Sequence, residues 1–378
     1  MRKSWRQIIM NPESIYFRSF TLMVCLVLLA CFGLSGCNPS SSTQADSNQT
    51  SDGKTNLEVF EADSLMVPFA KIQTAFEQAN PDINVEMQAH GSIQVIRQVT
   101  ELGQDVDVVA VADQALIPML MYQTPMPNGQ PYANWEIMPA TNQLVLAYTP
   151  QSKYANEINA NNWYQIISQP YVRLGFTDPR MDSVGYRTLM ALVLAESYYG
   201  VDNIMDDTVG EYFSTPITAN EENGISTIHV PELLEPTNDH LVLRGAQMQL
   251  LALLQSGDVD YTIDYKSEVI QAGLDYLELP PEINLGDSSF AQNYETTVVK
   301  LDYQRFANIN PVFYGAPIVY GMTIANNSKN QTAAIKFIQF VLSPEGQQIF
   351  QECSLPQLMP PECDNVSALP DSIKPTFQ

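Results

Sequence analysis

Basic residues are scarce in this sequence. It has 18 Lys and Arg against 42 Asp and Glu, which gives a formal net charge of −24 and a pI of about 4.3. We therefore expect no nucleic-acid partner, because phosphate backbones are bound through clustered Lys and Arg. Small anions remain possible ligands, since the backbone amides at helix N-termini bind them whatever the global charge.

Recognisable catalytic motifs are also missing. The sequence has no GxxxxGK[ST], GxSxG, HExxH or CxxC pattern, and His90, His229 and His240 are not spaced like metal ligands. An enzyme that works with a pair of carboxylates, as glycosidases do, is the alternative, although 42 acids supply many pairs by chance. We expect a protein that is not an enzyme and needs no cofactor.

A long apolar run occurs at the N-terminus and not beyond Cys37. FTLMVCLVLLACFGL (Phe20–Leu34) follows a basic lead and passes directly into LSGC, which ends at Cys37. This order resembles a bacterial lipoprotein signal, cleaved before a Cys that then carries lipid. A plain transmembrane helix is the alternative, but a run of about 15 residues is short for a bilayer. Residues 1–36 are thus predicted to be a signal peptide, and residues 37–54 a lipidated Cys and flexible tether at the extracytoplasmic face of the cell membrane.

Few cysteines remain beyond this region. Only Cys353 and Cys363 follow Cys37, and they flank a Pro-rich segment. An extracytoplasmic setting permits a disulfide, so we expect the two to be joined, with two free thiols as the alternative.

Short apolar strands alternate with helical patterns from residue 56 onward. Strands are predicted at residues 56–60, 83–89, 106–112, 171–177 and 259–265, and helices around residues 68–79, 92–102, 185–198 and 246–254. The spacing predicts an α/β protein with parallel sheets, and 378 residues suffice for two domains. Two extended runs, at residues 142–149 and 316–324, are expected to cross between the domains, and one last helix over residues 331–350 is expected to return to the first.

Small polar residues follow several of these strands. Ser64 and Ser92 each stand before a predicted helix, and DSVGYR precedes the helix that begins near Gly185. Ligands of open α/β sheets bind outside the carboxyl ends of the strands, where helix N-termini offer free N–H groups. Each Ser taken singly is more often only a helix cap. Three such junctions shared between two lobes are what an oxyanion cleft requires.

Several longer segments form a specific combination: FEADSLMVPFAKIQTAFEQANPDINVEMQAHGS, VDVVAVADQALIP, GYRTLMALVLAESYY, ENGISTIHVPE, LELPPEINLGD and GAPIVYGMTI. Together they resemble one known family, the archaeal-type tungstate/molybdate-binding proteins of ABC importers. A further segment, LSPEGQQIF, is shared with many periplasmic-type binding proteins. The resemblance implies a two-lobed type II periplasmic binding protein fold, with lobe 1 at residues 55–145 plus 317–378 and lobe 2 at residues 146–316. It also implies a monomer that delivers tungstate or molybdate to an ABC permease. Sulfate or phosphate is the alternative cargo.

The family's ligand-binding positions fall on particular residues here. Its two Gly-Ser pairs fall on Asp63-Ser64 and Gly91-Ser92, and its Asp-Pro-Cys-Gly-Tyr-Arg begins at Asp182. The resemblance implies an oxyanion site formed by Asp63, Ser64, Ser92, Asp182, Ser183, Val184, Gln247 and Tyr265.

Asp182 is a special case, because a carboxylate repels an anion. Tungsten and molybdenum can expand from four to six ligands, so the resemblance implies that Asp182 bonds the metal of the oxyanion. Gln247 stands where the family has a second carboxylate, and a neutral amide there could donate to an oxyanion oxygen instead. Asp63 replaces a Gly, and either change could favour a tetrahedral ligand. We expect Asp182 and Gln247 to face each other across the ligand; a merely capping role for Asp182 is the alternative.

Overall fold

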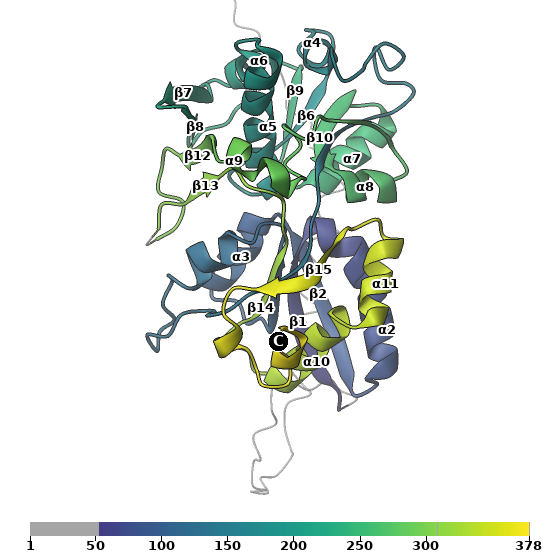
Figure 1. Ribbon diagram of the computed structural model, residues 1–378, viewed down its shortest axis with the longest axis vertical. Helices are drawn as coiled ribbons and strands as arrows, with labels where there is room; N and C mark the ends of the chain where they lie inside the picture. Colours follow the sequence, from purple (N-terminus) through teal and green to yellow (C-terminus); the bar gives the residue numbers. More distant parts are fainter. Residues whose placement is uncertain (1–52, 308, 378) are drawn as a thin grey trace, which may run out of the picture. The chain divides into compact units, whose positions relative to one another are not determined.

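The computed structural model describes residues 53–307 and 309–377, which lie in one compact unit, Asn48–Gln378. The predicted signal peptide, Cys37 and nearly all of the tether lie outside the described residues. No helix in the described ranges combines the length and apolar character needed to span a bilayer. The described chain forms three β-sheets with helices packed against them (Figure 1).

The first sheet is built from both ends of the described chain. Its strands, in spatial order, are β15 (Gln357–Cys363), β4 (Ile137–Ala140), β14 (Gly321–Ile324), β3 (Val108–Val111), β1 (Thr55–Ala62) and β2 (Ile83–His90). β1 is parallel to both β2 and β3, as the alternating pattern predicted, whereas β14 and β15 add antiparallel pairs. The sheet is therefore mixed, because the returning chain enters it from the opposite direction.

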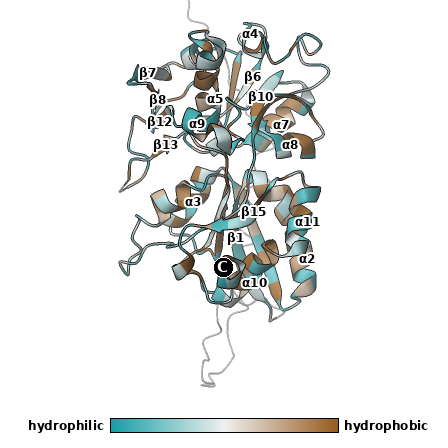
Figure 2. Ribbon diagram, viewed as in Figure 1, coloured by the Kyte–Doolittle hydropathy of each residue, from teal (hydrophilic) through white to brown (hydrophobic). Residues whose placement is uncertain are grey.

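Helices with one apolar face cover this sheet. They are α2 (Met66–Ala79), α3 (Ser92–Thr100), α10 (Gln331–Val341) and α11 (Pro344–Glu352). In α2 the residues Phe69, Ile72 and Phe76 are buried at helical spacing, and Phe76 packs edge-on against Phe337 of α10. Figure 2 shows the mixture of hydrophobic and hydrophilic residues on α2 and α11 that this one-sided burial requires.

The second sheet has a similar plan. Its strands are β11 (Asp275–Glu278), β5 (Leu144–Tyr148), β10 (Tyr261–Tyr265), β6 (Leu174–Thr177) and β9 (Leu241–Arg244). β6 lies between β10 and β9 and is parallel to both, so the carboxyl ends of these three strands share one edge. The helices of this part are α4 (Trp163–Ile167), α5 (Ser183–Tyr199), α6 (Ile204–Thr208), α7 (Gln247–Ser256), α8 (Lys266–Gln271) and α9 (Ala291–Tyr294). α7 and α8 pack beside β10 (Figure 1).

The third sheet was not predicted from the sequence. Its strands are β13 (Val312–Tyr314), β12 (Thr297–Leu301), β8 (Ile225–Val230) and β7 (Thr218–Glu222). β12 packs on α5, and Phe313 of β13 stacks on Tyr186 of that helix at a ring-centroid distance of 4.3 Å. The sheet thus supports the first turns of α5.

Two extended segments connect the first sheet to the other two. One passes from β4 through Thr141 into β5 of the second sheet, and the other leads from β13 of the third sheet into β14. They meet in an antiparallel bridge between Thr141 and Val319. The predicted lobe boundaries at residues 145/146 and 316/317 stay a prediction, because no further division of the unit Asn48–Gln378 is resolved.

Two predictions about helices are wrong. The last helix is two helices, because Pro344 disfavours the helical conformation at Ser343, whose side chain instead caps α11 by accepting from the Gly346 amide. The helix predicted around residues 92–102 ends earlier, at Thr100, and Leu102 is 58% exposed.

The predicted disulfide is also wrong, since Cys353 and Cys363 are both free thiols. Cys353 follows α11 and is buried, whereas Cys363 ends β15. The ends of β15 pair with Ala140 and Ile137 of β4.

Candidate functional site

Two of the predicted strand-to-helix junctions lie at one edge of the first sheet. β1 ends at Ala62, which pairs with His90 at the end of β2. Asp63 and Ser64 follow β1 in the short turn η2 (Asp63–Leu65), and Ser92 begins α3 after β2. Asp63, Ser64 and Ser92 are all buried. The parallel pairing of β1 and β2 therefore brings these residues to the same edge, as the sequence predicted.

The second sheet presents a matching edge. Asp182 is the N-cap of α5, and its Oδ1 accepts from the Val184 amide at 3.2 Å. Ser183 Oγ lies 2.9 Å from the Oη of Tyr265, the last residue of β10. Gln247 begins α7, with two residues between it and the end of β9. The capping role that was weighed for Asp182 is thus observed, and it points one carboxylate oxygen at a helix N-terminus.

These two edges are in contact. Ser183 Oγ lies 3.5 Å from Ser92 Oγ, and the Gln94 amide donates to the Met181 carbonyl at 3.2 Å. A Cβ atom added at Gly91 would lie only 2.6 Å from the Met181 carbonyl oxygen and 2.9 Å from Asp182 Oδ2. Only a residue without a side chain permits this approach. Gly91 therefore lets the loop after β2 pack against the loop after β6.

Arg187 also bridges the two sheets, and it was not among the predicted site residues. Its guanidinium donates to the Ala112 carbonyl at 2.5 Å and to Tyr265 Oη, and lies 3.3 Å from the Asp113 carboxylate. Tyr186 donates to the same carboxylate at 2.5 Å. A buried Arg needs such partners. The signal for this residue was its position one helical turn after Ser183, which places both side chains on one face of α5.

Carboxyl groups are concentrated around these junctions. Asp63, Asp182, Asp264 and Glu268 are all buried. Burial, and then the charge of Asp63, raises the pKa of Asp182 to about 7, and burial raises the pKa of Asp63 to about 6. Burial also raises the pKa values of Asp264 and Glu268 well above the ordinary range, and the charges of Asp182 and Asp63 add to both shifts. The mutual effects indicate that the four groups share one electrostatic environment.

Gln247 has an unexpected partner. Its Nε2 donates to the Oε2 of Glu268, in the first turn of α8. Within the described residues, Gln247 Oε1, Glu268 Oε1 and Asp63 Oδ2 are buried without a hydrogen-bond partner. Buried polar atoms of this kind are costly unless a ligand or water satisfies them. The position of Gln247 opposite Asp182 across a ligand stays a prediction.

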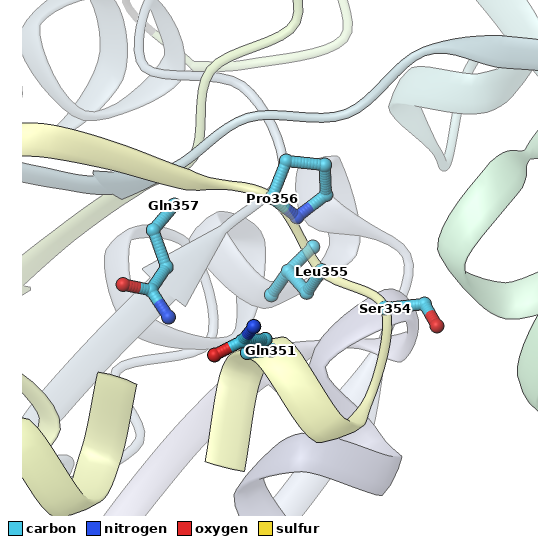
Figure 3. Close-up of a pocket in the computed structure, with 5 residues that line it drawn as sticks. All are labelled: Gln351, Ser354, Leu355, Pro356 and Gln357. Carbon is cyan, nitrogen blue, oxygen red and sulfur yellow. The ribbon is translucent and has the colours of Figure 1, made fainter. Parts of the chain in front are cut away.

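Other hollows of the described surface lie elsewhere. A pocket of about 360 Å³ is lined by Gln351, Ser354, Leu355, Pro356 and Gln357 (Figure 3), and it contains none of the predicted site residues. No set of three or more His, Cys, Asp or Glu side chains in the described ranges is arranged to hold a bare metal ion. The buried junctions between the two sheets remain the place where polar groups converge.

Comparison with known proteins decides the family. The model of the bacterial extracellular solute-binding proteins matches residues 57–353. The chain belongs to this family. It is therefore a solute-binding protein and not an enzyme.

Curated relatives align over nearly the whole chain. The molybdate/tungstate-binding protein WtpA of Thermococcus kodakarensis is 37% identical, with 90% of this chain and 92% of the relative covered. An uncharacterised solute-binding protein of Methanoculleus marisnigri is 34% identical, with 94% and 96% covered.

Solved structures share the fold of this solute-binding protein. The periplasmic molybdate-binding protein of Azotobacter vinelandii superposes with a TM-score of 0.52 at 15% identity, over 79% of this chain and 98% of that one. The sulfate-binding protein SubI of Mycobacterium tuberculosis gives 0.51 at 14% identity, over 80% and 86%. The fold is the type II periplasmic binding protein fold that the sequence predicted.

Proposed function

We propose that this solute-binding protein captures tungstate or molybdate and delivers it to an ABC permease. The observation that carries the proposal is the buried carboxylate of Asp182, held at the N-terminus of α5 beside Ser183, whose hydroxyl lies against Ser92 of the other sheet. A helix N-terminus and hydroxyl groups suit the oxygens of an oxyanion. A buried carboxylate suits a metal centre that can take further oxygen ligands. The relatives named for molybdate and tungstate support the same cargo.

A second candidate cargo is phosphate. A protonated phosphate oxygen can donate a hydrogen bond to a carboxylate such as Asp182 or Asp63, whereas sulfate has no proton to donate near neutral pH. The buried carboxyl groups at these junctions therefore favour phosphate over sulfate among simple tetrahedral anions. Coordination of the central atom by a carboxylate would not strengthen the binding of phosphate.

The melting temperature of the compact unit Asn48–Gln378 tests the cargo. A ligand present at 100 times its dissociation constant stabilises the folded state by about 2.7 kcal/mol. We expect tungstate and molybdate to raise the melting temperature and sulfate to leave it unchanged. A rise with phosphate alone would transfer the proposal to phosphate, and no rise with either metal oxyanion would refute it.

The location of the protein is part of the same proposal. Lipid on Cys37 would anchor it at the extracytoplasmic face of the membrane, and the polar residues 38–54 would tether the binding unit beside its permease. The support is the order of basic lead, apolar run and LSGC, together with membership of a family of extracellular proteins. Solute capture for import requires this side of the membrane.

A further inference from the structure

The two serines that meet between the sheets receive hydrogen bonds of different kinds. Ser92 Oγ accepts from the Ala112 amide at 3.0 Å, and a backbone N–H can only donate, so the direction of this hydrogen bond is fixed. Ser183 Oγ pairs with a second hydroxyl instead, Tyr265 Oη at 2.9 Å, and either hydroxyl can be the donor. The direction of the Ser183 contact therefore depends on what else Tyr265 Oη binds.

Arg187 decides that direction. Its guanidinium donates to Tyr265 Oη, and an arginine side chain has no acceptor atom. The oxygen of Tyr265 thus accepts from Arg187, and the hydroxyl proton turns away from the guanidinium, towards Ser183 Oγ. Burial raises the pKa of Tyr265 above its ordinary range, so this proton stays on the phenol near neutral pH.

The hydroxyl proton of Ser183 then has no short acceptor within the described residues. Ser183 Oγ lies 3.4 Å from Asp182 Oδ1 and 3.5 Å from Ser92 Oγ, and both distances exceed the range of about 2.5–3.0 Å that is typical of a hydroxyl donor. Ser92 is in a similar position, because its oxygen already accepts from Ala112. Two buried hydroxyl protons on facing sheet edges are therefore available to the oxygens of an anion.

Arg187 itself is held by groups of the first sheet. It lies in α5 and is 3% exposed, and it contacts the Ala112 carbonyl at 2.5 Å and the Asp113 carboxylate at 3.3 Å, both just beyond β3. Within the described structure Arg187 makes no hydrogen bond to Ser183. Any influence of its hydrogen bonds on that serine therefore passes through Tyr265.

We infer that Arg187 is a positioning residue for oxyanion binding, which acts through Tyr265 to make the Ser183 hydroxyl a donor towards the ligand. The inference rests on the proposed function, but it holds for any oxyanion whose oxygens accept at Ser183. The competing explanation is a purely structural Arg187 that balances the charge of Asp113. Only the positioning role makes the effect of Arg187 on binding depend on Ser183 and Tyr265.

A double-variant cycle tests this dependence, measured by titration calorimetry with molybdate on the full chain in detergent. Loss of a hydrogen bond to a charged group corresponds to about tenfold or more in affinity, so Arg187→Met and Ser183→Ala should each weaken binding about tenfold. The double variant should bind within about threefold of Ser183→Ala alone, because residues that act as one unit are not additive. Independent losses would multiply to about a hundredfold, and that result would overturn the inference.

Tyr265→Phe removes the hydroxyl that connects the two residues. In this background Arg187→Met should change the molybdate affinity less than about threefold, and a tenfold loss there would overturn the inference. Arg187→Lys keeps a charged donor opposite Asp113 and should bind more tightly than Arg187→Met. If Arg187→Met does not fold, Arg187→Lys takes its place in the cycle, and its loss of affinity should likewise vanish with Tyr265→Phe.

Tyr186→Phe is the matched control. It removes a hydrogen bond to Asp113 from the same helix, keeps the ring that stacks on Phe313, and leaves the contact between Arg187 and Tyr265 in place. Its affinity should change less than about threefold, since it alters no donor to Tyr265. A loss as large as that of Arg187→Met would overturn the inference, because disturbance of Asp113 alone would then explain both.

The wild type separates this inference from the proposed cargo. If it binds phosphate but neither metal oxyanion, the proposal of tungstate or molybdate fails, and the same cycle is measured with phosphate as the probe. If it binds none of the three anions, both the proposed function and this inference are overturned.

Discussion

Adding a single methyl group at Gly91 should weaken ligand binding without unfolding the protein. Gly91 has φ −56° and ψ 143°, a conformation that alanine adopts freely. The cost of Gly91→Ala therefore arises only between segments, where the new Cβ would lie 2.6 Å from the Met181 carbonyl and 2.9 Å from Asp182 Cβ. Contacts this short force one loop away from the other, and such overpacking costs about 1–3 kcal/mol.

That cost falls on the arrangement in which Ser92 and Ser183 meet. A factor of ten in affinity corresponds to about 1.4 kcal/mol, so the dissociation constant for tungstate or molybdate should rise roughly 5- to 150-fold. Titration calorimetry measures this change, and thermal unfolding without ligand should be close to that of the wild type.

Gly245→Ala is the matched control. Its added Cβ would meet only the flexible end of the Met181 side chain, at 3.1 and 3.2 Å from the sulfur and the terminal methyl. A methionine side chain can move aside, so binding should change little. Wild-type affinity in Gly91→Ala would refute the reasoning, because the close packing of the two loops would then play no part in the bound state.

Two further predictions concern charge and location. Burial, followed by the charges of Asp364 and Asp113, raises the pKa of Glu136 from 4.5 to about 9, so its contribution to stability is present below pH 4.5 and is lost as pH rises towards 9. Between pH 5 and 8 the unfolding free energy of the wild type should therefore fall by up to about 4 kcal/mol on account of Glu136, and Glu136→Gln should not show this part of the fall. Urea titrations at several pH values measure the difference. Parallel pH profiles of variant and wild type would contradict the prediction. Cys37→Ala should release the protein from the membrane fraction, and unchanged sedimentation with membranes would count against the lipid anchor.

The strands and helices that could be predicted are those whose signals are local. β1, β2 and β3 follow from short apolar runs, and α5 follows from Asp182 as a cap before a long apolar stretch. The third sheet could not be predicted in this way. β7 is largely exposed and lacks an apolar pattern, so it depends on pairing with β8 rather than on its own sequence.

Seven of the eight predicted site residues fall into two groups, and Gln247 is the eighth. The first group is joined by hydrogen bonds or neighbouring positions, because its members lie at strand ends or helix starts of the facing sheet edges: Ser92, Asp182, Ser183, Val184 and Tyr265. Asp63 and Ser64 lie at the same edge as Ser92. The sequence analysis missed Arg187, Asp113 and Glu268. The residues next to an acid or an Arg in the sequence do not show which distant residue it will contact.

The amino-acid sequence by itself determined the local conformations and the chemistry available at the strand ends. Hydrophobic spacing, capping residues and the shortage of cations act over a few residues, or over the chain as a whole, and need no knowledge of the fold. Only the tertiary structure decided which groups meet. Arg187 reaches a carbonyl 75 residues away, and Gln247 meets Glu268 across 21 residues. Strand order and register create these contacts, because they place the ends of β6, β9 and β10 at one edge. The tertiary structure also leaves Cys353 and Cys363, which were expected to be joined, as free thiols.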